Sequence, residues 1–284
     1  MNVEPPPEHV RTAFGITGVE PVALGPGWEG GWRCGEVVLS AVADHARAAW
    51  SAKVRETLFV DGVRLARPVR STDGRYVASG WRADTFVAGV PEPRYDEVVS
   101  AAVRLHEATG QLERPRFLTQ GPSPAWGEVD VFIAADRAAW EERPFYSVPP
   151  GVQTAPSSAE GARSVELVNQ LAGLRTPTRS ASQLVHGDLC GTVLFVGSAA
   201  PGITDITPYW RPASWAAGVV VVDALSWGEA DDGLLERWSA LPEWPQMILR
   251  ALIFRLSVHA LHPRSTADSF PGLARTAALV RLIL

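Results

Sequence analysis

The sequence predicts an α+β protein in which a small β-rich part precedes a larger, mainly helical part. Two observations support this fold class. Residues 1–89 contain short apolar and β-branched runs separated by glycine-rich turns. Residues 90–284 contain long segments in which apolar residues recur at helical spacing. We therefore expect a small antiparallel sheet with one helix up to Gly89, and a helical lobe after it.

The first three strands are expected on either side of a glycine-rich turn. Apolar and β-branched runs predict strands over residues 19–24, 31–34 and 36–42. The turn between the first two has the sequence GPGWEGG, and its glycines mark a chain reversal. These three strands form the expected start of the sheet.

A helix and two further strands complete the expected N-terminal part. The segment from Asp44 to Phe59 has Ala46, Trp50 and Val54 on one helical face, and Asp44 is a suitable N-cap residue. Two strands then flank Thr72-Asp73-Gly74, a sequence typical of a hairpin turn. The expected sheet therefore has five antiparallel strands and one inserted helix.

The second part is expected to be helical around two short strand segments. The strand segments are residues 183–197 and 202–210, each with loops. Within the helical pattern, residues 218–222 (GVVVV) would favour a strand if taken alone. A loop rich in proline and serine is expected over residues 147–159. The predicted helical segments are residues 94–110, 129–143, 158–174, 215–227, 233–241, 244–261 and 272–284.

Composition narrows the class of protein. The formal net charge is −5 with a pI near 5.7, which argues against a nucleic-acid partner that is bound through phosphate contacts. No apolar run reaches the roughly 20 residues of a membrane span, and no secretory signal pattern is found. Cys34 and Cys190 are not at metal-ligand spacing. We expect a cytoplasmic protein with reduced thiols and neither a nucleic-acid nor a membrane partner.

Two short motifs carry the expected chemistry. The sequence HGDL, from His186 to Leu189, precedes GTVLF, and ITD ends at Asp205, seventeen residues after Asp188. With the order of a β-rich part and a helical part, these motifs resemble the aminoglycoside phosphotransferase and protein-kinase-like superfamily. The resemblance covers nearly the whole chain and implies a bilobal protein-kinase-like fold. The chain also resembles a group of actinobacterial proteins of unknown function, with GITDITPYWRP as a shared feature.

The resemblance implies a role for each motif residue. Asp188 corresponds to the catalytic base, Asp205 to the metal ligand, and Asp223 to an aspartate that supports the catalytic loop. The chemistry agrees, because phosphoryl transfer needs a carboxylate near the acceptor hydroxyl and a metal such as Mg²⁺ at the phosphates of ATP. His186 is expected to brace the loop by hydrogen bonding. The alternative for Asp188 is a turn residue that caps its own backbone.

Two positions depart from the pattern of the superfamily. Ser40 stands where the third strand has a phosphate-binding lysine, and Thr192 stands where an asparagine holds magnesium. A serine hydroxyl carries no charge, so another cation is required. The only lysine of the chain, Lys53, and Arg33 after the glycine-rich turn are the two candidates, although a lysine on an amphipathic helix is usually only solvated.

The glycine-rich turn is a further candidate for nucleotide binding. Gly27 and Gly30 would allow backbone amides to approach an anion. Pro26 has no amide, however, and Glu29 would repel a triphosphate if it pointed inward, so a plain hairpin is the alternative. No P-loop signature is present.

Two function classes follow from these residues. The first is a phosphotransferase that uses ATP and Mg²⁺ to phosphorylate a hydroxyl of a small-molecule acceptor, with Tyr209, Trp210 and Arg211 as candidate acceptor residues. A packed turn is the alternative for those three. The second is a pseudokinase-like module that binds a nucleotide or metabolite without transfer, which the departures at Ser40 and Thr192 favour. The sequence does not specify the acceptor, the activity or the oligomeric state.

Overall fold

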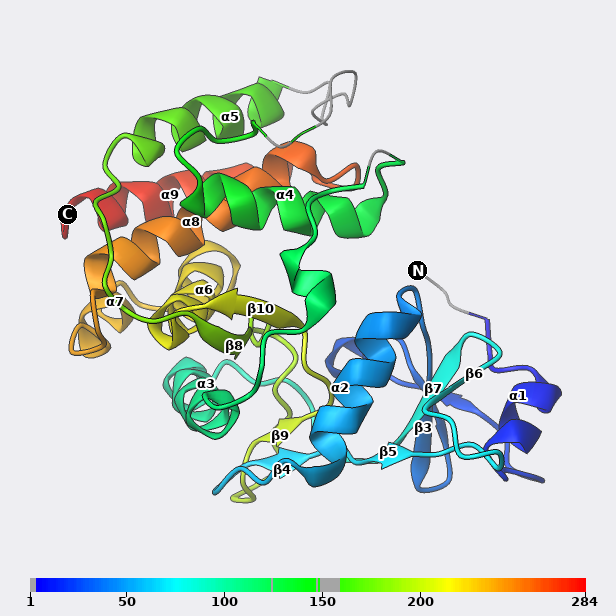
Figure 1. Ribbon diagram of the computed structural model, residues 1–284. Coiled ribbons are helices and arrows are strands. Elements are labelled where there is room, and N and C mark those ends of the chain that lie inside the picture. The colour runs from blue at the N-terminus through cyan, green and yellow to red at the C-terminus, as the bar shows by residue number, and fades with distance from the viewer. Residues whose placement is uncertain (1–3, 124, 147, 149–158) are drawn as a thin grey trace. The chain divides into compact units, whose positions relative to one another are not determined.

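A computed structural model of the chain describes residues 4–123, 125–146, 148 and 159–284. The chain forms two compact units (Figure 1). The first contains residues 1–117 and 183–210, and the second contains residues 118–182 and 211–284. The lobe boundary expected near Gly89 is a different division of the chain and stays a prediction. The loop expected over residues 147–159 lies almost wholly outside the described residues.

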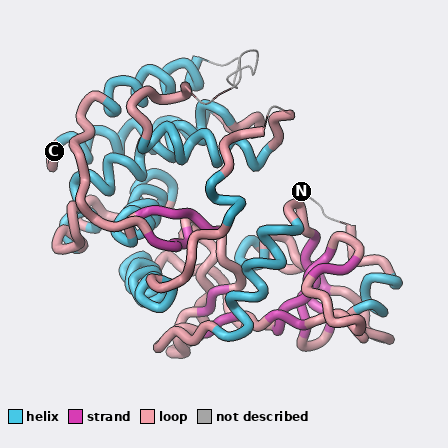
Figure 2. Tube along the Cα trace, in the orientation of Figure 1, coloured by secondary structure: helices cyan, strands magenta, loops and turns pink. Residues whose placement is uncertain are grey.

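The first unit is built on an antiparallel sheet. In the described part of the chain this sheet has six strands in the order β1-β2-β3-β7-β5, and β6 also pairs with β7. The first three predicted strands are confirmed, and Figure 2 shows the sheet in magenta. The strands of this sheet are β1 (Val22–Ala23), β2 (Trp32–Cys34), β3 (Val37–Ala41), β5 (Pro68–Val69), β6 (Val77–Ala78) and β7 (Trp81–Thr85).

The end of the sheet differs from the expected hairpin. The tight reversal lies between β6 and β7 at Ser79 and Gly80, which both have positive φ angles of 49° and 78°. Two central residues with positive φ match the twist of a two-residue hairpin. The predicted turn after Ser71 does form, since the Ser71 amide donates to the Arg75 carbonyl at 2.8 Å, but it connects β5 to β6. The sequence therefore predicted a turn that does form, but not the hairpin of β6 and β7 that follows it.

The α-helices α1, α2 and α3 and two small strand pairs complete the described part of the first unit. The helix α2 (His45–Thr57) begins at Asp44, whose side chain accepts from two backbone amides, as predicted. The helix α3 (Tyr95–Thr109) packs against β8 and ends before Gly110, as predicted. A short helix that the sequence analysis did not predict, α1 (Glu8–Ala13), precedes the sheet. The strand pairs are β8 (Gln183–His186) with β10 (Pro208–Arg211), and β4 (Arg64–Leu65) with β9 (Gly202–Ile203) in parallel.

The second unit is a helical assembly around α8. This helix is buried along nearly its whole length and packs against α4, α5, α6 and α9. The GVVVV segment lies in α6 and is helical, because burial on nearly all sides overrides the β-propensity of valine. Asp223 of α6 pairs with Arg255 of α8 at 2.5 Å. The helices of this unit are α4 (Glu128–Trp140), α5 (Ala159–Ala172), α6 (Ala213–Trp227), α7 (Leu234–Arg237), α8 (Trp244–Leu261) and α9 (Phe270–Arg281).

Among the described helices of both units, none combines the length and apolar character that crossing a membrane requires.

Candidate active site

The loop that follows β8 holds Asp188 through its backbone. The amide of His186 donates to Nε2 of His106 at 3.0 Å, and the amide of Asp188 donates to Nδ1 of His186 at 3.1 Å. His186 is buried, and burial lowers its pKa to about 4 despite the nearby carboxylates of Asp188 and Asp205. A neutral imidazole accepts at one nitrogen, as this loop requires. This geometry fits the loop-bracing role predicted for His186, and Asp188 itself is half-buried.

Thr192 and Tyr209 pack against the same loop. The Thr192 hydroxyl donates to two backbone carbonyl oxygens, that of Asp188 at 2.9 Å and that of Leu189 at 3.1 Å. The ring of buried Tyr209 lies against Gly187 so closely that a β-carbon there would collide with it. Thr192 therefore closes the turn around Asp188, and Tyr209 fixes the glycine before it.

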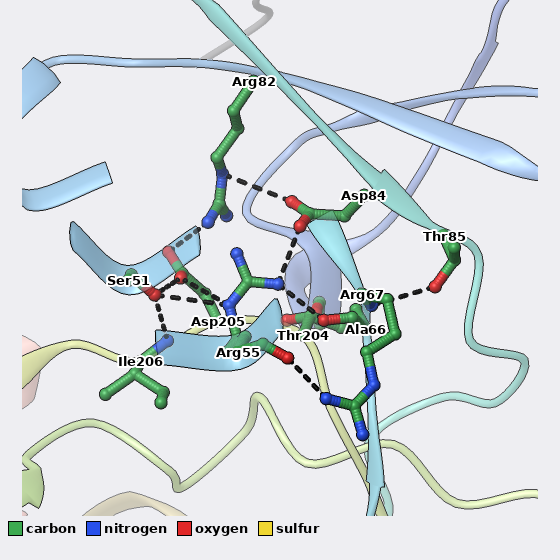
Figure 3. A network of polar contacts seen from close by, with 11 residues as sticks. Ser51, Arg55, Ala66, Arg67, Arg82, Asp84, Thr85, Thr204, Asp205 and Ile206 are labelled. Carbon is green, nitrogen blue, oxygen red and sulfur yellow. Dashed lines mark hydrogen bonds and ion pairs between the residues drawn. The ribbon is translucent and has the colours of Figure 1, made fainter. Parts of the chain in front are cut away.

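Asp205 lies in a network of polar groups at the end of β9 (Figure 3). Its carboxylate accepts from the Ser51 hydroxyl at 2.5 Å and pairs with Arg82 and with Nε of Arg55, the latter at 3.4 Å. Burial raises the pKa of Asp205, but the two guanidinium groups outweigh this effect and bring the pKa down to about 2. The carboxylate is therefore ionised at neutral pH, although 21% of the side chain remains exposed.

Arg55 is anchored by a second carboxylate. Its Nη1 lies 2.7 Å from Asp84 and donates to the Ala66 carbonyl at 2.7 Å. Arg55 and Asp84 are both fully buried, with exposures of 0% and 1%. Ser51 lies one helical turn before Arg55 on α2, so this helix sends a hydroxyl and a guanidinium toward the same aspartate, Asp205.

Ser40 and Arg82 are directly opposite each other in the sheet. The register of β3 and β7 pairs Ser40 with Arg82 and Val38 with Asp84. Opposite residues of an antiparallel pair project to the same face. Ser40 is 6% exposed, and its hydroxyl has no hydrogen-bond partner within the described chain. Arg82 is also 6% exposed and pairs with Asp205 on that face.

The glycine-rich turn lies beside the segment that contains Asp205. The Thr204 hydroxyl, one residue before Asp205, donates to the Gly27 carbonyl at 3.1 Å. Gly27 is buried against Leu194, whereas Gly30 has a φ of 77° and open space around it. The backbone of the turn therefore contacts the segment after β9 that contains the metal-ligand candidate.

Trp28 and Glu29 of this turn have opposite surroundings, because Trp28 is buried and Glu29 keeps an exposed surface. Trp28 lies with Val38, Val87 and Leu194, and its ring stacks on Phe86 with centroids 6.1 Å apart.

Glu29 keeps an exposed surface but has a raised pKa. The first cause is desolvation by the surrounding protein, and the second is the negative charge of Asp205. The Asp188 carboxylate adds to the effect, while Arg82 opposes it. Since Asp188 and Asp205 both act on Glu29 and on His186, the two carboxylates predicted from the motifs share one electrostatic environment.

The two predicted replacement cations lie in other surroundings. Lys53 is exposed on α2. Arg33 donates to the Gly35 carbonyl and to Glu36, and its guanidinium lies 3.7 Å from the Phe86 ring centroid. Their assignment to phosphate binding stays a prediction.

Trp210 and Arg211 end the strand β10. Trp210 is half-buried. Arg211 belongs to the second unit, where it forms two hydrogen bonds of 2.7 and 2.6 Å to Asp136 and stacks over Trp140. A role in acceptor binding stays a prediction for both residues and for Tyr209.

Sequence reasoning missed Arg82, Asp84, Arg55 and Ser51. A signal was present in the segment WRADT, because two charged residues at alternate positions of a β-strand lie on one face. Charged residues are rarely buried unless they are paired. A strand with two inward charges therefore indicates an ion-pair network.

Comparison with solved structures identifies the fold. A microcompartment-associated aminopropanol kinase matches with a TM-score of 0.56 and 16% identity, covering 96% of this chain and 93% of its own. The chain has the kinase-like fold of the aminoglycoside phosphotransferases. One such enzyme, from Alicyclobacillus acidocaldarius, matches with a TM-score of 0.56 and 14% identity over 99% of this chain and 95% of its own.

A spectinomycin phosphotransferase in complex with ADP and spectinomycin has the same kinase-like fold. It matches with a TM-score of 0.56 and 12% identity over 96% of each chain. No protein-family model and no curated protein matches the sequence. The comparisons therefore confirm the predicted fold class.

Proposed function

We propose that this chain is a nucleotide-dependent phosphotransferase that acts on a hydroxyl group of a small molecule. The observation that carries the proposal is the position of Asp205, whose ionised carboxylate pairs with Arg82 in the same electrostatic environment as Asp188. The kinase-like fold supports the proposal. Its solved representatives include an aminopropanol kinase and a spectinomycin phosphotransferase with bound ADP.

Asp188 acts as the base in the proposed reaction. The hydroxyl proton of the acceptor passes to the Asp188 carboxylate as the acceptor oxygen bonds to the terminal phosphorus of the nucleotide. The bond between that phosphorus and its bridging oxygen breaks, and a nucleoside diphosphate leaves. His186 and Thr192 keep Asp188 in position through the hydrogen bonds of the loop.

The residues at Asp205 fit Mg²⁺ on one condition. The described residues contain no cluster of three or more metal-ligating side chains, and two guanidinium groups beside Asp205 oppose a bare cation. A triphosphate would neutralise those groups, after which Asp205 and the Thr192 hydroxyl offer oxygen ligands of the kind Mg²⁺ prefers. When bound, the ion would neutralise the charge of the phosphates.

A phosphate-transfer assay tests the proposal. The protein is incubated with ATP, MgCl₂ and a panel of amino alcohols and aminoglycosides, and nucleoside diphosphate and phosphorylated acceptor are quantified together. We expect acceptor-dependent turnover that falls about a hundred- to ten-thousandfold in Asp188→Asn, the range that general-base catalysis contributes. Glu56→Gln is a matched control, because Glu56 is an exposed residue of α2 whose carboxylate accepts from Arg70 and Tyr76.

A non-catalytic binding module is the second candidate function, and Trp28 favours it. The indole covers the apolar surface of Val38, on the same strand face as Ser40. A flat base with its phosphates at Arg82 would need that surface. If the native protein binds a small-molecule acceptor or tripolyphosphate but not ATP, and no acceptor is phosphorylated, the binding module is the better description.

A further inference from the structure

We infer that Arg82 is the phosphate-binding cation of this site and takes the role of the lysine that Ser40 replaces. The inference rests on the proposed function, because it concerns the phosphates of the same ligand. It assigns the missing charge to the neighbouring strand rather than to Lys53 or Arg33.

The sheet register places the charge of Arg82 on the required face. Arg82 is the direct cross-strand partner of Ser40, so both side chains project from the same face of the sheet. Gly31 of the glycine-rich turn packs against the Ser40 hydroxyl so closely that a β-carbon at Gly31 would lie 2.7 Å from it. A long side chain at position 40 would have to displace this turn, whereas Arg82 reaches Asp205 from β7.

The two arginines of the network are held to different degrees. Arg55 has strong hydrogen bonds to Asp84 and to the Ala66 carbonyl, both at 2.7 Å. Arg82 is paired through Nη1 with Asp205, a carboxylate that keeps some exposure to solvent, and its Nε lies 3.7 Å from Asp84. Arg82 is therefore the arginine that can leave its carboxylate for another anion, while Arg55 keeps Asp84 neutralised.

The charges of the network explain why the Arg82 guanidinium can stay buried when no ligand is bound. Arg55 and Arg82 balance Asp84 and Asp205, so the buried groups carry no net charge (two positive and two negative). Burial lowers the pKa of Arg82, but the carboxylates of Asp205 and Asp84 outweigh it and raise the pKa, so the guanidinium stays charged. A phosphate can then replace Asp205 as its partner, and the planar guanidinium can bind two phosphate oxygens at once.

Titration calorimetry with tripolyphosphate, ATP and adenosine tests the inference. The first comparison is made without Mg²⁺, between Asp205→Asn and the double variant Asp205→Asn with Arg82→Met. Both variants lack the Asp205 charge, so the double variant leaves no unpaired carboxylate at position 205. We expect tripolyphosphate to bind about ten- to a hundredfold more weakly to the double variant, the loss of one charge-assisted contact. Adenosine affinity should be the same in both.

A second set of variants tests whether the loss of binding comes from the missing charge at position 82 or from a disturbed fold. Arg82→Lys keeps the charge but not the planar fork, so it should bind ATP more tightly than Arg82→Met and more weakly than the native protein. Arg75→Met, an exposed arginine of the same unit that pairs with Asp73, is the matched control and should leave every affinity unchanged.

The outcomes distinguish the inference from the proposed function. If the double variant binds tripolyphosphate as well as Asp205→Asn does, the inference is wrong, even if the native enzyme transfers phosphate. If binding depends on Arg82 but no acceptor is phosphorylated, the inference stands and the proposed function fails. Absence of binding of both ATP and tripolyphosphate to the native protein would overturn both.

Discussion

Ser40 on β3 and Arg82 on β7 are direct cross-strand partners whose side chains share one buried face of the sheet. A serine at this position removes a charge from β3, and the arginine opposite supplies one from β7. The network around Asp205 therefore contains a cation, Arg82, on the same face of the sheet as Ser40. The following predictions depend on this arrangement and on the loop that holds Asp188.

Magnesium should bind to this protein only together with a nucleotide. Without a nucleotide, Arg82 and Arg55 already neutralise Asp205 and repel a second cation. With ATP the phosphates neutralise the arginines, and Asp205 becomes available as a ligand. In calorimetry we expect no heat from MgCl₂ alone and at least a tenfold increase in ATP affinity when Mg²⁺ is present. Asp205→Asn should abolish that increase, whereas Glu56→Gln should preserve it. Saturable Mg²⁺ binding to the native protein without nucleotide would contradict this account.

Lys53 and Arg33 should be dispensable for phosphate binding. Lys53 is exposed on α2, and Arg33 is already engaged by Glu36 and by the ring of Phe86. We expect Lys53→Met and Arg33→Met each to change the ATP dissociation constant by less than about threefold, a range typical of exposed ion pairs. The measurement is the same calorimetric titration, with Arg82→Met as the positive control. A loss of tenfold or more in either variant would restore the corresponding sequence-based candidate.

The sequence predicted the backbone of the site better than its charges. The β-branched runs and the glycine-rich turn gave β1, β2 and β3 close to their observed bounds, and Asp44 marked the start of α2. These features are local, so a short window contains the information that determines them. The hydrogen bond by which His186 braces its loop is local too, because the motif itself places a backbone amide two residues after an imidazole.

The ion-pair network could not be predicted in the same way. Asp205 and Ser51 are 154 positions apart in the chain, and Arg55 and Asp84 are 29 apart. Their proximity depends on the parallel pairing of β4 with β9 and on the register of β3 with β7. Both are tertiary features. The sequence alone therefore indicated Lys53, the only lysine of the chain, and Arg33 after the glycine-rich turn, but not Arg82 across the strand.

Shortening Trp28 should expose the apolar surface beside the network. Trp28 packs on Val38, Val87 and Leu194 and is 5% exposed. We expect Trp28→Ala to destabilise the protein by about 3 kcal/mol or more, as for other large buried aromatic residues. Adenosine or ATP should recover part of this loss by filling the space, and urea unfolding with and without adenosine measures the recovery.

A control for Trp28 is available at Trp227. That tryptophan is 47% exposed, and its substitution by alanine should cost less and respond to no nucleoside. If Trp28→Ala gains no stability from adenosine or ATP, the surface under the indole is not a base-binding surface.

The stability of the first unit should fall as the pH is lowered from 7 to 5, because two buried histidines stay neutral in the fold. Burial lowers the pKa of His106 to about 3, with a further contribution from His186, and lowers the pKa of His186 to about 4. In the unfolded chain both titrate near 6.5. Between about pH 6.5 and pH 4 the unfolded state therefore binds more protons than the folded state, so stability is present at neutral pH and is lost on acidification.

The expected loss is about 2 kcal/mol for each histidine between pH 7 and pH 5, measured as the free energy of unfolding in urea. In His106→Gln the amide oxygen of glutamine can still accept from the His186 amide, which donates to His106 in the native chain. This variant should lose about half of the pH dependence because one of the two titrating groups is gone. His9→Gln, which changes an exposed histidine of α1, should keep the native pH dependence. An unchanged slope in His106→Gln would mean that the neutral His106–His186 pair is not what couples this loop to pH.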